Sequence, residues 1–194
     1  MATTPSGTSE ATVPGSATSG GGYFPNVDGS SWTYNLTNNS TTDVFTYRTT
    51  YSGAIAANGT TYQIQIVEDF SRHDATSEAF WIVNNDTAKN YGSGGTTPSS
   101  QANYTLLSFP LQLNKTWIVA VQGAQEVIGT MEAHESLTVP AGTYADTFRL
   151  HAMIGNSQEI YFWISKDVGL TKQIQIQYLP TYSISTYELT AKNF

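Results

Sequence analysis

Apolar and polar residues alternate with a period of two along most of this chain, and that period is typical of half-buried β-strands. In the clearest case, Tyr62, Ile64 and Ile66 alternate with Gln63 and Gln65. Such a strand is expected to have one buried apolar face and one solvent-exposed polar face, as strands of antiparallel sheets often do. No long stretch keeps a 3.6-residue apolar period, so the sequence predicts no long helix.

The same pattern predicts about eleven or twelve strands. They are expected at residues 31–37, 44–52, 61–70, 78–83, 88–92, 104–109, 115–122, 126–139, 143–150, 159–165, 171–178 and 182–190. Every connection except 93–102 is short, so strands adjacent in sequence should pair as a meander. A meander of this length must curl, split or close to protect its edges. We therefore expect an all-β antiparallel fold with one strongly curved sheet, either a half-barrel or a barrel. Two stacked sheets are the alternative.

Two turns mark the strongest hairpins. Val139-Pro140-Ala141-Gly142 has proline at the second turn position and glycine at the fourth, where each is favoured. In the first half of the chain, Asn58-Gly59 is the strongest short hairpin signal that a sequence can carry. Each turn is therefore expected to join two antiparallel strands.

Three motifs recur in the same order around these turns. Phe24-Pro25 stands eight positions before Trp32, and Phe109-Pro110 stands eight positions before Trp117. The third motif is Phe80-Trp81-Ile82 in the first half and Phe162-Trp163-Ile164 in the second. The spacing predicts an internal duplication with a period of about 85 residues, with copies at about 23–102 and 103–194. Chance similarity between two β-rich halves is the alternative.

Residues 1–22 consist almost entirely of Thr, Ser, Gly, Ala and Pro. Such a segment cannot bury apolar surface, so we expect a disordered tether followed by a single duplicated β domain at 23–194. Tethers of this kind often precede the β domains of mature bacterial lipoproteins and surface-anchored proteins. No signal-peptide pattern opens the chain, so such a segment is expected to be absent or removed.

Charge and composition exclude several function classes. The chain has 8 Lys and Arg against 15 Asp and Glu, a net charge of −7, and so lacks a basic footprint for nucleic acid or anionic lipid. Charged residues make up only 12%, about half the usual share, and this favours an exported protein with polar sheet faces. The absence of cysteine excludes disulfides and thiolate chemistry. No apolar run is long enough to predict a membrane span.

Catalytic motifs are sparse. His134 and His151 are expected to face solvent on polar strand positions. Glu68-Asp69 and His73-Asp74 could supply an oxygen-rich cation site, although a solvated loop end is the simpler interpretation. Metalloprotease, nucleophile-elbow and phosphate-loop motifs are all missing from the sequence. The sequence therefore predicts no enzyme, no catalytic residue, no metal and no cofactor, with a hydrolase as a weaker alternative.

The aromatic residues, 12 Tyr, 8 Phe and 4 Trp, say more about function than the catalytic residue types do. Trp32, Trp81, Trp117 and Trp163 are expected to be structural anchors. The alternative is that they line a concave face that binds an apolar small molecule or lipid. Exposed Tyr, Asn and Thr would instead suit a structural or adhesive module that contacts protein or carbohydrate. The first functional hypothesis is the apolar-ligand binder, and the second is the adhesive module.

Several of these motifs together resemble a widespread group of uncharacterised bacterial secreted proteins and lipoproteins. The pattern of that group is an opening YFPL-x-x-G-x-x-W-x-Y, a VTVPAGTF hairpin and a closing W-x-x-x-GVG-x-VK. The matching residues are Tyr23-Phe24-Pro25 with Gly29 and Trp32-Thr33-Tyr34, Leu107 to Leu111 with Trp117, Leu137 to Tyr144, and Tyr161 and Trp163 with Asp167 to Leu170 and Lys172. The resemblance covers residues 23 to about 178. Asn26 departs from the opening Leu of the pattern, and no Pro precedes Val168.

The resemblance implies a fold similar in outline to the lipoprotein-carrier half-barrels of the bacterial envelope. It also implies a location in the periplasm, the outer envelope or the cell surface. Its motifs are turns and strand anchors, so it brings no catalytic residues to this chain.

Overall fold

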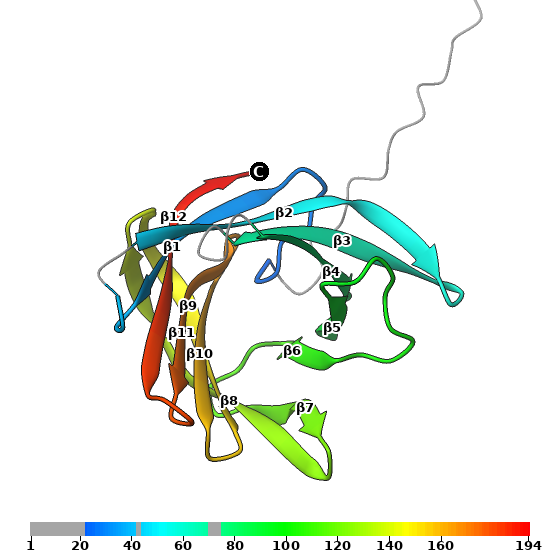
Figure 1. The fold of residues 1–194 in the computed structure, drawn as a ribbon. Helices are drawn as coiled ribbons and strands as arrows, with labels where there is room; N and C mark the ends of the chain where they lie inside the picture. Colours follow the sequence, from blue (N-terminus) through cyan, green and yellow to red (C-terminus); the bar gives the residue numbers. More distant parts are fainter. Residues whose placement is uncertain (1–21, 42–43, 70–74) are drawn as a thin grey trace, which may run out of the picture.

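The computed structural model describes residues 22–41, 44–69 and 75–194. These residues form twelve antiparallel strands in one sheet and no helix (Figure 1). The strands are β1 (Ser31–Asn38), β2 (Val44–Ala57), β3 (Thr60–Asp69), β4 (Ala75–Val83), β5 (Thr87–Ser93), β6 (Tyr104–Ser108), β7 (Thr116–Gln122), β8 (Gln125–Val139), β9 (Gly142–Ile154), β10 (Gln158–Ser165), β11 (Gly169–Gln177) and β12 (Ser183–Asn193). The predicted all-β meander is confirmed, and its single sheet curls into a nearly closed barrel.

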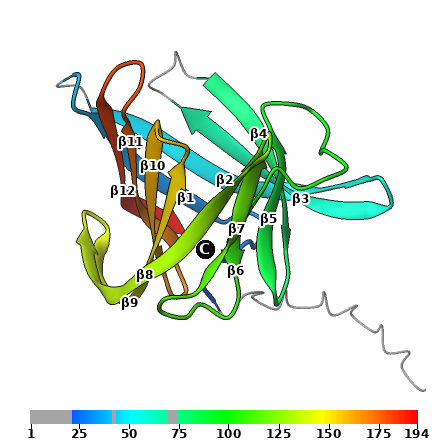
Figure 2. The ribbon, with the colours of Figure 1, turned by 90° about the horizontal axis from the view of Figure 1, so that it is seen from below.

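The order of strands around the barrel is β6-β5-β4-β3-β2-β1-β12-β11-β10-β9-β8-β7. Strands adjacent in sequence pair with each other, with the exception of β6 and β7. One further ladder joins the two ends of the domain, because β1 pairs with β12 in a register that sets Trp32 opposite Lys192 and Tyr34 opposite Leu189. That ladder lies at the centre of the sheet order and connects the half formed by β1 to β6 with the half formed by β7 to β12 (Figure 2).

The joint between β6 and β7, which we call the seam, has a different construction. No ladder pairs these two strands in the described sheet. Instead, Trp117 Nε1 donates a hydrogen bond of 3.0 Å to the carbonyl of Thr105 on β6. Next to it, the ammonium of Lys115 donates to the carbonyls of Ser108 (2.8 Å) and Pro110 (3.0 Å). Side chains therefore hold this joint where backbone pairing holds the others.

Gly129 makes room for the side chain of Val119 beside Trp117 at the seam. Trp117 and Gly129 are cross-strand partners on β7 and β8. A Cβ atom at Gly129 would lie 2.6 Å from Val119 Cγ2 and 3.5 Å from the indole ring of Trp117. Real Cβ atoms do not approach other atoms as closely as 2.6 Å, so the close packing at the seam requires glycine at this position.

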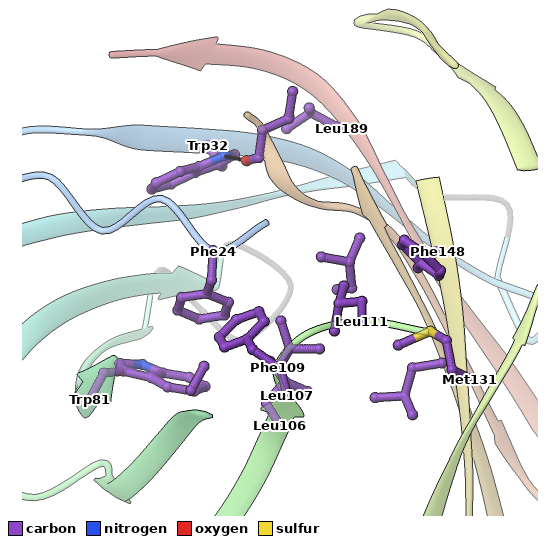
Figure 3. Close-up of a cluster of buried hydrophobic side chains, with 14 of the residues drawn as sticks. Phe24, Trp32, Trp81, Leu106, Leu107, Phe109, Leu111, Met131, Phe148 and Leu189 are labelled. Carbon is purple, nitrogen blue, oxygen red and sulfur yellow. Dashed lines mark hydrogen bonds between the residues drawn. The ribbon is translucent and has the colours of Figure 1, made fainter. Parts of the chain in front are cut away.

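Residues 22–30 cross one end of the barrel, and we call this segment the cap. Phe24 of the cap packs at 5.2 Å between ring centroids against Trp81, and points toward Phe109 in the connection between β6 and β7 (Figure 3). Phe24, Phe109 and Leu111 are buried in the same core cluster. The side chains of the cap and of the β6–β7 connection therefore fill this end of the barrel.

The repeated motifs occupy corresponding places in the two halves. Trp32 lies on β1 and Trp117 on β7, the first strand of each half, whereas Trp81 lies on β4 and Trp163 on β10, the fourth strand of each. Both predicted turns join paired antiparallel strands, since Ala57 pairs with Thr60 and Val139 pairs with Gly142. In the first turn, Asn58 and Gly59 have φ values of 52° and 73°, as a type I′ turn requires. The duplication itself stays a prediction.

The inward face of two strands differs from the sequence expectation. On β3 the apolar parity is not the one that faces the barrel interior: Gln65 lines the interior, and Ile64 lies on the opposite face beside Phe80. On β11, Gln173 lines the interior and Ile174 pairs with Tyr161 on the outer side. Alternation correctly predicted two unlike faces, but it could not tell which face was inside.

Replacing Trp117 with Phe tests the seam. Loss of the indole N–H leaves the Thr105 carbonyl without its donor, and should lower the free energy of unfolding by about 1 kcal/mol. Amide hydrogen exchange in β6 and β7 should accelerate. Trp163→Phe is the matched control, because it also removes an indole hydrogen bond, to Glu135 at 2.9 Å, but far from the seam. Equal exchange rates in β6 and β7 for both variants would contradict this account.

Candidate functional site

The barrel encloses a cavity of about 530 Å³. This volume lies within the range of about 300–1,000 Å³ that is typical of small-molecule sites. The cap contributes Phe24 and Pro25 to its lining, so the cavity is closed at the cap end. A small barrel can be filled by its own side chains, whereas this one leaves room for a ligand.

The two halves of the barrel contribute chemically different walls. The first half supplies most of the aromatic side chains, and we call this side the aromatic wall. It consists of Phe24, Trp32, Tyr34, Tyr47, Tyr51, Trp81 and Tyr104, together with the aliphatic Val67, Ala79 and Leu106. The second half supplies an aliphatic wall, made of Val119, Val121, Val127, Ile154, Ile160 and Leu170 with two alanines. Phe162 is the one aromatic side chain that the second half adds to the described lining.

The lining carries no charge. Among the residues that the structure places around the cavity, none is Asp, Glu, Lys, Arg or His. Its polar groups are amides and hydroxyls, and several are already paired. Trp81 Nε1 donates to Gln65 Oε1 at 3.1 Å, and the Tyr34 hydroxyl donates to the carbonyl of Leu170 at 2.9 Å. The second bond connects the aromatic wall to β11 of the aliphatic wall.

Tyr51 and Tyr104 of the aromatic wall stay neutral at physiological pH. Burial raises the pKa of Tyr104 to about 12. Burial also raises the pKa of Tyr51 well above its ordinary value, and the nearby phenols of Tyr34 and Tyr104 raise it further. Because burial disfavours the phenolate, these groups remain hydroxyls.

Tyr51 differs from its neighbours in hydrogen bonding. Its side chain is only 2% exposed, and its ring packs edge-on against Trp32 at 5.9 Å between centroids. The Tyr51 hydroxyl is buried and has no hydrogen-bond partner among the described residues. Such a hydroxyl lowers stability, and this one has almost no surface accessible from the cavity.

The cavity reaches the surface beside the seam. Ser93, Asn103, Val121 and Gln122 all line the cavity and are all exposed. They come from the end of β5, the approach to β6 and the end of β7. The mouth therefore lies at the barrel end opposite the cap, between the strands that the seam separates.

Hydrogen bonds at several points hold the cap in place. Trp32 Nε1 donates to the carbonyl of Val168 at 2.7 Å, which ties the strand after the cap to the β10–β11 turn. Gln63 Nε2 donates to the Asn26 carbonyl at 2.9 Å. The Tyr23 hydroxyl donates to Asp146 Oδ1 at 2.5 Å. The cap is thus part of the barrel wall and connects strands from both halves.

The four predicted site residues lie in three different environments. Trp32 and Trp81 line the cavity. Trp117 bonds across the seam, and Trp163 packs between Arg149 and Lys172, with each cation within 6 Å of the indole centroid. The cavity tyrosines were missed by sequence reasoning, although Tyr34 shares its strand face with Trp32, and that shared parity was a usable signal.

The two histidines in the described part of the chain, His134 and His151, lie apart from the cavity. His134 Nε2 contacts Asp146 Oδ1 at 2.7 Å, and His151 Nδ1 contacts Glu132 Oε1 at 2.8 Å, but none of the four lines the cavity. His73 and Asp74 of the predicted cation site fall outside the described residues, and the carboxylate of Glu68 pairs with Arg48.

The described residues contain neither a metal-binding cluster nor a membrane-spanning helix. No three of their His, Asp or Glu side chains gather closely enough to hold a metal ion. This part of the chain also has no helix with the length and apolarity needed to cross a bilayer.

The contact between the cap and Asp146 predicts a dependence on pH. Hydrogen bonds from Tyr23 and then His134 hold the pKa of Asp146 below its ordinary value, and Lys166 adds a weaker attraction. A carboxyl of this kind stabilises the fold above the unfolded-state pKa of about 4, and that stabilisation is lost as pH falls through the lowered folded value. Asp146→Asn should therefore flatten the loss of stability below about pH 4 in urea unfolding. The exposed Glu126→Gln is the control, and an equal flattening there would contradict the assignment.

Comparison with solved structures shows the fold class. The chain is similar in fold to a candidate exported protein with a YmcC-like fold from Bacteroides fragilis NCTC 9343, with a TM-score of 0.52 and 9% identity over 88% of this chain and 98% of that chain. A candidate lipoprotein from Parabacteroides distasonis ATCC 8503 aligns over the same shares, with a TM-score of 0.42 and 12% identity. No protein-family model and no curated protein matches the chain. At 9% identity the likeness to the Bacteroides fragilis protein is one of fold alone.

Proposed function

We propose that this protein is a non-enzymatic, exported binding protein that holds an apolar small molecule or lipid inside its barrel. The observation that carries the proposal is the cavity of about 530 Å³ with an apolar, uncharged lining. Transfer of apolar surface from water into such a site is favourable by about 25 cal/mol per Å². A charged ligand would lose its hydration there without gaining an ion pair.

The location outside the cytoplasm rests on separate support. The chain has no cysteine and only 12% charged residues, and its first 22 residues have the composition of a tether. The Bacteroides fragilis structure of similar fold is named as a candidate exported protein. Together these features favour a domain that works in the bacterial envelope.

Filling the cavity should abolish binding. Ala152 lies on β9, is 3% exposed and lines the cavity, so Ala152→Phe places a ring in the space that a ligand would occupy. We expect at least a tenfold loss of affinity for an environment-sensitive apolar dye, measured by fluorescence titration. Ala145→Phe is the matched control because Ala145 is an exposed residue of the same strand, and this variant should bind as the wild type does. A cavity-filled variant that binds the dye normally would contradict the proposed site.

Native mass spectrometry of the protein from its own host is the direct test. A co-purifying apolar molecule at near one-to-one stoichiometry is expected, and extraction after denaturation identifies its class. An unliganded monomer that also binds no apolar probe would refute the proposal.

A structural or adhesive module is the second candidate. Large apolar side chains are exposed at the mouth end of the barrel, among them Met153 (46%), Tyr178 (40%), Leu179 (59%) and Tyr182 (53%). Such a group of exposed side chains suits contacts with protein or carbohydrate. An unliganded, multimeric mass in the same experiment would favour this candidate over the carrier.

A further inference from the structure

Two glutamine side chains bring amide groups to the cavity. Gln65 on β3 and Gln173 on β11 both line it. The amide oxygen of Gln65 accepts the hydrogen bond from Trp81 Nε1, which leaves the N–H groups of its Nε2 without a partner among the described residues. The amide of Gln173 makes no hydrogen bond to any other described side chain or carbonyl. The cavity therefore has hydrogen-bonding capacity that the described part of the protein does not use.

These amides are accessible, unlike the Tyr51 hydroxyl. Both glutamines are partly exposed, and neither amide has a buried atom that lacks a partner. Strands β2, β1 and β12 separate β3 from β11, so the two amides border the cavity at different places on its wall. A ligand that fills the space between them displaces water from both. An amide that loses water and gains no new hydrogen bond weakens the complex.

The sequence supplies both groups with the same tetrapeptide. Gln-Ile-Gln-Ile occurs at residues 63–66 on β3 and again at 173–176 on β11. In both places a glutamine faces inward and an isoleucine faces outward. Gln63 serves the cap, because its Nε2 donates to the Asn26 carbonyl at 2.9 Å. The two glutamines that line the cavity have no such contact with the cap.

The free atoms of the two amides match a particular kind of ligand group. Nε2 of each glutamine donates, so both can bind an acceptor oxygen such as that of an ester or a ketone. A pure hydrocarbon would leave these donors unpaired. A carboxylate or phosphate would face no Lys, Arg or His side chain in the described lining, and neutral amides do not offset the charge of a buried anion.

We propose that the cavity selects an uncharged amphiphile that carries acceptor oxygens of the ester or ketone type, and that the amides of Gln65 and Gln173 bind these oxygens. The apolar part of the ligand packs against the aliphatic wall. This inference rests on the proposed function and adds to it the chemical class of the ligand and the residues that recognise it.

Three probes with the same number of non-hydrogen atoms separate these features: methyl octanoate, nonanoate and pentylbenzene. Each is titrated against the environment-sensitive apolar dye, and its affinity is measured from the displacement of the dye. The neutral ester should bind the wild-type protein at least about tenfold more tightly than the isomeric carboxylate at neutral pH. Equal binding of the two would overturn the inference and leave the carrier function standing. If neither the dye nor any probe binds, the carrier function itself fails.

Gln173→Leu tests the amide contact directly. The substitution removes the amide, keeps a side chain of similar size, and breaks no hydrogen bond to a described residue. The affinity for methyl octanoate should fall about fivefold to tenfold, while that for pentylbenzene stays the same or rises. Gln65→Leu should shift the two affinities in the same way, and should also lower the Tm because Trp81 Nε1 loses its acceptor.

Gln175→Leu is the matched control. Gln175 lies two residues further along β11 and is not part of the described lining, so this variant should bind all three probes as the wild type does. The inference is overturned if Gln173→Leu changes the affinities for methyl octanoate and pentylbenzene by the same factor. It is also overturned if Gln175→Leu weakens the ester as much as Gln173→Leu does.

Discussion

The pairing of β1 with β12 is the constraint on which the rest of the barrel depends. It joins the beginning of the domain to its end, at the centre of the twelve-strand order. The residues of β1 also reach beyond this ladder, because Trp32 and Tyr34 donate hydrogen bonds to the carbonyls of Val168 and Leu170 near the start of β11. One strand thus fixes the relative position of two six-strand halves, and the cavity exists because those halves are held face to face.

Local sequence signals predicted the elements of this fold well. Segments with a two-residue period became strands, and Asn58-Gly59 formed the turn that its residue types favour, because both signals depend on backbone and neighbour geometry alone. Which face of each strand points into the barrel could not be predicted in the same way. On β3 and β11 the glutamines face inward, since the interior is a cavity that accepts uncharged polar groups and is not a solid apolar core.

The candidate site was only partly accessible from the sequence. The repeat identified four tryptophans as equivalent, yet Trp32 and Trp81 line the cavity while Trp163 lies on the outer side between two cations. Equivalent positions in a repeat share their place in the sheet but not their neighbours, which come from distant strands. The partnerless hydroxyl of Tyr51 depends on the positions of groups from several strands, so no local pattern could have indicated it.

The construction of the seam has a consequence for the size of the barrel. In a barrel closed by ladders throughout, strand number and register fix the circumference. Here the last joint, between β6 and β7, is made by an indole and an ammonium group that contact carbonyl oxygens, and side chains can rotate without breaking a ladder. The circumference of the barrel is therefore adjustable at the seam between β6 and β7. For the proposed carrier, the enclosed volume would be a property that a bound molecule can change, and the range of guest sizes would extend above the volume of the closed barrel.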